Sequence, residues 1–237
     1  MITTVLFDMD GTLLPMDYDT FANGYFGIIA KKMAPHGFDP KEVVAAVWSG
    51  TKAMVKNDGS VTNERAFWAE AERIYDKEKC ALLYQLFEDL YEHEFDTCES
   101  FCQSDPVIRE TVARIRSLGL RTAVATNPLF PELAMRKRLM WSGVPAEWFE
   151  TITTYENSRF CKPNPAYFTE TAEKLGVKPE ECLMVGNDMT EDLAARKAGM
   201  EVFIVTDCLI NKQGIDMDTV PHGNWRDLRA YIDRLPR

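Results

Sequence analysis

The sequence predicts an α/β fold, a doubly wound parallel sheet that carries a small α-helical bundle as an inserted cap domain. Four short runs of β-branched and apolar residues alternate with segments of helical periodicity: residues 3–7, 121–125, 182–185 and 202–205. Strands that alternate with helices favour a parallel sheet covered on both faces. Between the first two runs, from residue 18 to residue 93, apolar residues recur at spacings of three and four, which is typical of helices.

The first predicted strand leads into a sharp turn and then into the helical insertion. Residues 3–7 are followed by Asp8-Met9-Asp10-Gly11-Thr12, where glycine permits a change of direction. Three turn-forming stretches divide the insertion into about four helices: Pro35-His36-Gly37, Asn57-Asp58-Gly59-Ser60 and Asp76-Lys77-Glu78-Lys79. We therefore expect an α/β core of residues 1–16 and 102–237 and a helical cap of residues 17–101.

The elements after the insertion follow the same alternation. Asp105-Pro106 opens a helix that ends at Gly119. The strand 121–125 then ends at Thr126-Asn127-Pro128. The remaining pattern predicts helices at 132–141, 166–175 and 191–198, with strands at 182–185 and 202–205 between them.

Composition and charge narrow the class of function. The chain has 237 residues, of which 46% are hydrophobic, enough for one sizeable core and a smaller second domain. Its 27 basic and 37 acidic residues give a net charge of −10, which disfavours binding to nucleic acid or to an anionic membrane surface. No apolar run approaches the roughly 20 residues that span a bilayer. We expect a cytoplasmic protein with a small-molecule partner, and the sequence carries no indication of an oligomeric state.

Three of the predicted strands end in polar pairs: Asp8 and Asp10, Thr126 and Asn127, Asn187 and Asp188. In open α/β sheets, functional groups gather at the carboxyl ends of the strands, so one crevice could hold all six. On an extended segment Asp8 and Asp10 would point the same way, and two facing carboxylates call for a hard cation such as Mg²⁺ or for a lysine. Taken alone, Asp-x-Asp-Gly is also an ordinary turn in which aspartate caps the backbone.

The whole set of motifs resembles the haloacid dehalogenase-like (HAD) superfamily. Four ordered segments carry the resemblance: Val5–Leu13 with its DMDGT turn, Ala123–Asn127, Lys162-Pro163, and Val185–Asp192. They cover the full chain in the order of that superfamily, and the helical insertion stands where its members with an α-helical cap carry the cap. This order makes a chance match improbable.

The resemblance implies a role for each residue of the motifs. Asp8 would be the nucleophile that forms an aspartyl-phosphate, and Asp10 the general acid and base. Thr126, Asn127 and Lys162 would hold the phosphoryl oxygens, and the charge of Lys162 would also keep Asp8 ionised.

The resemblance also implies a Mg²⁺ site. Asp8, the backbone carbonyl of Asp10 and Asp188 would be its ligands, while Asp192 and Asn187 would lie in the surrounding shell. The commonest form of the fourth motif has Asp directly after Gly186, where this chain has Asn187. We assign the metal to Asp188, because an anionic oxygen binds Mg²⁺ better than an amide.

The implied activity is Mg²⁺-dependent hydrolysis of a small-molecule phosphomonoester through an aspartyl-phosphate. A phosphomutase is the first alternative, and a non-catalytic phosphate-sensing module is the second. A dehalogenase is disfavoured because its relatives lack the acidic residue equivalent to Asp10. The aromatic residues of the insertion, including Trp48, Phe67, Trp68 and Tyr84, are expected in the core of the helical bundle rather than in a ligand pocket.

Overall fold

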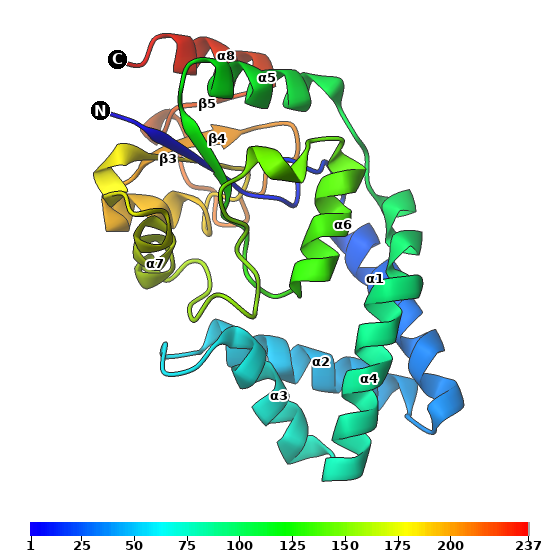
Figure 1. Ribbon diagram of the computed structural model, residues 1–237. Coiled ribbons are helices and arrows are strands. Elements are labelled where there is room, and N and C mark those ends of the chain that lie inside the picture. The colour runs from blue at the N-terminus through cyan, green and yellow to red at the C-terminus, as the bar shows by residue number, and fades with distance from the viewer. Residues whose placement is uncertain (237) are drawn as a thin grey trace.

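The computed structural model describes residues 1–236 and contains one parallel sheet (Figure 1). Its strands are β1 (Thr4–Phe7), β2 (Arg121–Val124), β3 (Cys182–Gly186), β4 (Glu201–Val205) and β5 (His222–Gly223). Their order across the sheet is β2-β1-β3-β4-β5, and every neighbouring pair is parallel. The predicted doubly wound parallel sheet is confirmed.

Side chains alternate along β1, and this alternation builds two layers of core. Val5 and Phe7 pack into the layer of α5 (Pro106–Ser117), α6 (Glu132–Ser142) and α8 (Trp225–Asp233). Leu6 packs into the opposite layer, which includes α7 (Pro165–Leu175) and the 3-10 helix η5 (Leu193–Ala198). All three side chains are fully buried. Helices therefore cover both faces of the sheet, as its mainly apolar strands require.

Four α-helices lie between β1 and α5. They are α1 (Tyr18–Met33), α2 (Pro40–Val55), α3 (Asn63–Ile74) and α4 (Lys77–His93), followed by the 3-10 helix η2 (Phe95–Phe101). Each α-helix begins after a side chain that accepts a hydrogen bond from a backbone N–H of its first turn: Asp17, Asp39, Thr62 and Asp76. The predicted helical insertion is confirmed, and its exact limits at residues 17 and 101 stay a prediction.

The sheet and the insertion are joined at two points near each other. Met16 and Cys102 form an antiparallel bridge, and Gln103 N–H donates to the Pro15 carbonyl at 2.9 Å. The two chain crossings therefore lie side by side, close to the predicted limits between core and insertion.

The structure differs from the sequence prediction in the last third of the chain. The segment predicted as an α-helix at 191–198 winds as the 3-10 helix η5, in which Gly199 N–H donates to the Arg196 carbonyl three residues back. The prediction did not include β5 or α8. Short 3-10 turns complete the chain at Ala34–His36, Ala146–Trp148, Pro179–Glu181 and Met217–Thr219.

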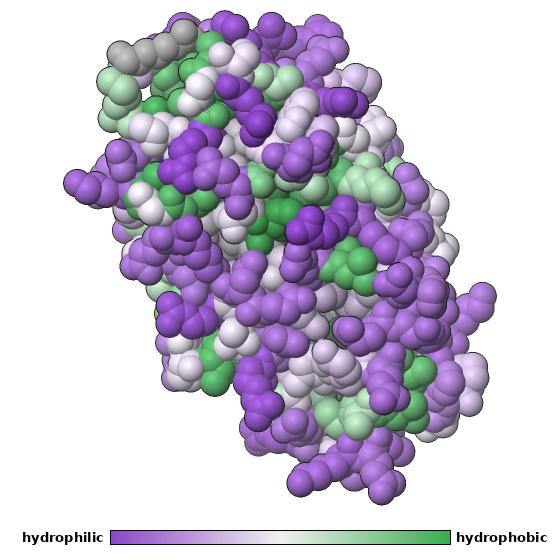
Figure 2. Space-filling view, viewed as in Figure 1, coloured by the Kyte–Doolittle hydropathy of each residue, from purple (hydrophilic) through white to green (hydrophobic). Residues whose placement is uncertain are grey.

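The surface seen in Figure 2 is mostly hydrophilic, and its hydrophobic residues form small separate patches. Within residues 1–236, no helix combines the length and the apolar character needed to cross a bilayer.

Candidate active site

The carboxyl end of β1 lies where the strand order of the sheet reverses. The chain leaves β1 for β2 on one side and later returns to β3 on the other. Asp8 directly follows β1, while Thr126 and Asp188 each stand two positions after the last residue of β2 and β3. In doubly wound sheets this switch point is where ligands bind. The predicted polar pairs therefore stand on three adjacent strands at that point.

Lys162 forms a buried bridge between two carboxylates. Its Nζ lies 2.9 Å from Asp8 Oδ1 and 2.6 Å from Asp192 Oδ1, and the residue is 1% exposed. Burial alone would lower the pKa of Lys162, but the charges of Asp192 and Asp8 outweigh it and hold that pKa well above its usual range. Lys162 therefore stays protonated and presents a permanent positive charge to Asp8.

Asp192 anchors this bridge from the segment after β3. Its Oδ2 accepts the backbone N–H of Asp188 at 2.9 Å. A Cβ on Gly186 would lie 2.1 Å from the carboxyl carbon of Asp192, so the absence of a side chain there makes room for the carboxylate. Burial raises the pKa of Asp192 to about 6 despite the neighbouring Lys162.

Asp8 and Asp188 each keep one carboxylate oxygen without a hydrogen bond to residues 1–236. Asp8 uses Oδ1 for Lys162, while Asp188 uses Oδ1 for the backbone N–H groups of Thr190 and Glu191, at 2.6 and 2.9 Å. Within residues 1–236, no group of three or more His, Cys, Asp or Glu side chains is arranged as a metal site. Two carboxylates and a backbone carbonyl suit Mg²⁺, which usually binds one or two protein carboxylates and keeps several waters.

The residues after β2 are held by the neighbouring core and by Glu191. The carbonyl of Thr126 accepts hydrogen bonds from the hydroxyls of Thr153 and Tyr167, at 2.8 and 2.7 Å. The Nδ2 of Asn127, predicted to face the phosphoryl group, instead donates to Glu191 Oε2 at 3.0 Å. Burial raises the pKa of Glu191 to about 7 against the opposing charge of Lys162. Glu191 thus belongs to the site, although the sequence analysis gave it no role.

Asn187 is buried beneath the loop after β1, and both ends of its amide are used in hydrogen bonds to neighbouring loops. Its Oδ1 accepts a hydrogen bond from Thr12 at 3.2 Å, and its Nδ2 donates to the Cys208 carbonyl at 2.6 Å. A Cβ on Gly11 would lie 2.3 Å from that Nδ2. Asn187 therefore fastens the turn after Asp10 to the loop after β4.

Asp10 forms an ion pair with Arg138, which the sequence analysis did not identify. Arg138 Nη2 contacts Asp10 Oδ1, and Arg138 is 1% exposed. The guanidinium lies over two rings, with its carbon 4.7 Å from the centroid of Phe130 and 5.4 Å from that of Phe21. Burial lowers the pKa of Arg138 to about 9, although Asp8 opposes this effect.

A signal for Arg138 was present in the sequence. On α6 it stands three and four residues after the buried Met135 and Ala134, on the apolar stripe of the helix. A charged residue at such a position is almost never fully buried without a partner.

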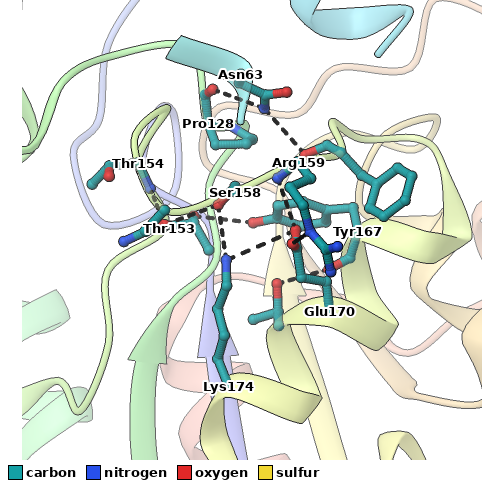
Figure 3. A network of polar contacts seen from close by, with 12 residues as sticks. Asn63, Pro128, Thr153, Thr154, Ser158, Arg159, Tyr167, Glu170 and Lys174 are labelled. Atoms are coloured by element: carbon teal, nitrogen blue, oxygen red, sulfur yellow. Dashed lines mark hydrogen bonds and ion pairs between the residues drawn. The ribbon is translucent and has the colours of Figure 1, made fainter. Parts of the chain in front are cut away.

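A network of polar contacts fixes the loop that carries Lys162 (Figure 3). Asn63, at the start of α3, donates from its side chain to the carbonyls of Pro128 and Phe160 at 3.3 and 3.4 Å. Arg159 pairs with the buried Glu170 of α7 at 2.8 Å. The insertion is thereby tied both to the loop after β2 and to the loop before Lys162.

An aromatic cavity separates the insertion from the core. Its walls come from α1 to α4, from the loop after β2 and from the loop near residue 155. Asp10 also lines it. The aromatic residues of its walls are Tyr18, Phe21, Tyr25, Phe26, Trp48, Phe67, Trp68, Phe87, Tyr91, Phe130 and Tyr155. Trp68 packs against Phe87 in the bundle, as predicted. The prediction was wrong for Trp48, which is 48% exposed, and for Tyr84, which is 40% exposed. The buried face of α2 runs on to Gly50 and Met54, and Trp48 lies beside that face, with its ring 5.1 Å from the ring of Phe26. Phe67 is half-buried and, like Trp48 and Trp68, lines the cavity.

The chain matches a family model over residues 2–199, that of the haloacid dehalogenase-like hydrolases. It is 26% identical to a glyceraldehyde 3-phosphate phosphatase of Methanothermobacter thermautotrophicus over 93% of this chain and 96% of the relative. It is 29% identical to a phosphoglycolate phosphatase of Mesorhizobium japonicum over 85% of this chain and 81% of the relative.

Solved structures share the fold. A 2-haloacid dehalogenase of Pseudomonas syringae pv. tomato superposes with a TM-score of 0.63 at 23% identity, covering 99% of each chain. A HAD phosphatase of Thermococcus onnurineus superposes with a TM-score of 0.59 at 22% identity, covering 98% of each chain. Since one fold serves both reactions, the side chains of the site have to decide between them.

Proposed function

The chain belongs to the haloacid dehalogenase-like hydrolase family, and from this premise we propose that it is a Mg²⁺-dependent phosphatase of small phosphomonoesters that uses Asp8 as its nucleophile. The observation that carries the proposal is the buried Lys162, which bridges Asp8 and Asp192 through contacts of 2.9 and 2.6 Å. A fixed cation beside a carboxylate favours the ionised form that can attack phosphorus.

Asp8 would keep its free oxygen for the metal and attack through Oδ1, the oxygen beside Lys162. A bond forms between that oxygen and phosphorus while the bond from phosphorus to the alcohol oxygen breaks, and Asp10 gives a proton to the leaving oxygen. Asp10 then takes a proton from water as the water attacks phosphorus and releases Asp8. Asp8 returns as a free carboxylate and Asp10 in the protonated form from which it started, and the products are an alcohol and inorganic phosphate.

The phosphoryl oxygens would be held by donors from the two neighbouring loops. Within residues 1–236 the Thr126 hydroxyl makes no hydrogen bond, so it can donate to a phosphoryl oxygen. Lys162 supplies positive charge beside Asp8. Asn127 would contribute after its amide exchanges Glu191 for the substrate. Such donors stabilise the negative charge on the transferring group.

Asp8, Asp188 and the Asp10 carbonyl would hold Mg²⁺. The two carboxylate oxygens without hydrogen bonds are hard anionic donors and fit this ion. The bound cation would supply positive charge beside the phosphoryl oxygens. Asp192 and Asn187 would act behind this set, the first by orienting Lys162 and Asp188 and the second by fixing the turn after Asp10.

The relatives support hydrolysis over the alternatives. Both are named as phosphatases of small phosphorylated metabolites, which favours a phosphatase over a phosphomutase. Asp10 stands where a metal-dependent phosphatase needs its acid, which disfavours dehalogenation. Asp8, Asp10 and Lys162 are all present, and a non-catalytic sensing module has no need to keep the three together. The helical insertion would serve as a cap that excludes water from the site.

The test is release of inorganic phosphate from a panel of phosphomonoesters, with and without Mg²⁺. We expect release that requires Mg²⁺ and disappears in Asp8→Asn, which keeps the shape of the side chain but removes the nucleophilic charge. Retained activity in Asp8→Asn would refute the nucleophile. A requirement for a trace of sugar bisphosphate, with no net release of phosphate, would favour the phosphomutase.

A further inference from the structure

We propose that the substrate's alcohol is a compact apolar group, a branched aliphatic chain or a single aromatic ring, bound in the aromatic cavity between the helical insertion and the core. This inference rests on the proposed phosphatase function and specifies its substrate class. Three features of the cavity carry it: the position of Asp10, the chemistry of the walls and the size of the space.

The carboxylate of Asp10 faces this cavity. Its Oδ1 contacts Arg138, and the guanidinium of Arg138 lies between the rings of Phe130 and Phe21, both of which line the cavity. An acid that protonates the leaving alcohol must lie within hydrogen-bond reach of its oxygen. With phosphorus at Asp8, the carbon part of the alcohol is therefore directed past Asp10 into the cavity.

Several polar groups of the cavity wall are paired within the protein, whereas Trp68 Nε1 has no hydrogen-bond partner within residues 1–236. The hydroxyls of Tyr25 and Tyr91 hydrogen-bond to each other, and the Thr51 hydroxyl donates to the Val47 carbonyl at 2.9 Å. A second carboxylate or an aldehyde placed here would lose its water without gaining these groups as partners. An apolar group would lose nothing and would gain contact with the aromatic rings.

A second groove beside Asp10 fits an anionic ester poorly. This hinge groove runs along residues 15–20 and 100–103, where the insertion joins the core, and along the loop after β4. It carries the carboxylates of Asp17, Asp19 and Asp207, with one nearby cation, Lys212. Three like charges disfavour a phosphomonoester, which is itself negative. The aromatic cavity is therefore the favoured seat of the alcohol, and a seat in the hinge groove is the outcome that would contradict it.

The size of the cavity limits the alcohol to a compact group. Its volume is about 80 Å³, roughly half of the ~150 Å³ apolar cavity that is known to admit benzene. A short branched chain fits this space as it stands, and a single ring requires the cavity to enlarge. Fused rings and long chains do not.

The experiment compares esters whose leaving alcohols are all weakly acidic. Benzyl phosphate and 3-methylbutyl phosphate are the apolar probes, while 2-phosphoglycolate and glyceraldehyde 3-phosphate are the polar ones. We expect kcat/KM to be roughly tenfold or more higher for the apolar pair, the range that a hydrophobic pocket achieves for one or two methylene groups. No activity on any ester with Mg²⁺ would count against the phosphatase itself, whereas activity with a preference for the polar pair would refute only the apolar seat.

Two cavity variants sharpen the comparison. Ala22→Leu adds volume from the half-buried Ala22 on α1, and Trp48→Ala removes a half-exposed wall. We expect each to lower kcat/KM for the apolar esters by roughly tenfold and to change it less than about twofold for the polar esters. Equal effects on both pairs would refute the inference.

A binding measurement gives a readout independent of turnover. Trp48 and Trp68 both line the cavity, so their fluorescence should change when benzyl phosphate is added to the Asp8→Asn variant with Mg²⁺. We expect saturation with benzyl phosphate and a weaker response in Ala22→Leu. A response equal in Ala22→Leu, or one seen with 2-phosphoglycolate alone, would contradict occupation of the cavity.

Discussion

Replacing Arg138 with methionine should separate activity from stability. Burial lowers the pKa of Arg138 to about 9. This shift corresponds to a free-energy penalty of roughly 5 kcal/mol for keeping the charged guanidinium in the folded protein. Because the pKa lies below its ordinary value, this penalty applies in full at every pH below about 9. Two ring contacts offset roughly 2 kcal/mol each.

These opposing contributions nearly cancel, so Arg138→Met should leave the free energy of unfolding within about 2 kcal/mol of the parent. The partner left behind, Asp10, has 27% of its side chain exposed and can be hydrated. A methionine also fills the space beside Met135 and the two rings. Urea unfolding at pH 7 measures this quantity, with Arg136→Met on the exposed side of the same helix as the control.

Activity should respond differently, because Asp10 loses the group that holds it. General acid catalysis contributes about 10²- to 10⁴-fold, and we expect Arg138→Met to lose roughly 10- to 100-fold in kcat on benzyl phosphate. The loss should be smaller on 4-nitrophenyl phosphate, whose leaving group needs little protonation. This account would be refuted if Arg138→Met lowered the free energy of unfolding by more than about 4 kcal/mol. It would also be refuted if the variant lost the same factor of activity on both esters.

Three further predictions address the charged bridge and the metal. Lys162→Met should lower the free energy of unfolding by about 3–5 kcal/mol, or Tm by roughly 6–20 °C, because it leaves buried carboxylates unpaired; adding Asp192→Asn should restore part of the loss in calorimetry, and no recovery would contradict the bridge. Gly186→Ala should reduce kcat/KM by roughly 10- to 100-fold, because the added Cβ would displace Asp192. The control is Gly27→Ala on the exposed side of α1, where no atom lies near the added Cβ. It should keep full activity and raise the free energy of unfolding by up to about 1 kcal/mol. Asp188→Asn should raise the Mg²⁺ concentration for half-maximal activity at least about tenfold; an unchanged Mg²⁺ titration would remove Asp188 from the ligand set.

The fold was accessible from the sequence because its signals are local. Short runs of β-branched and apolar residues predict strands β1 to β4, and apolar residues at spacings of three and four predict α1 to α4. The two-residue β5 has too few positions to show any period. The 3-10 winding of η5 also lay beyond the pattern, because apolar spacing alone does not distinguish three from 3.6 residues per turn.

The charged part of the candidate site was partly accessible for the same reason. Asp8, Thr126 and Asp188 follow strands, so parallel pairing alone brings them to one edge of the sheet. Lys162 lies between strands, and only its resemblance to a motif suggested that it belongs with Asp8. The contact itself depends on the loop that Glu170 and Asn63 hold in place.

By itself the sequence determined the order of β1 to β4 and of the helices of the insertion, the family and the carboxylates that stand at the strand ends, because each of these depends on residues that are close together in the chain. Only the tertiary structure decided that Arg138 faces Asp10, that Glu191 takes the amide of Asn127, and that aromatic residues of the insertion line a cavity over the acid. The first two contacts join residues 128 and 64 positions apart in the chain, and the cavity is built from several helices. Sequence spacing does not set the distance between such segments, because they meet only when the insertion packs on the core.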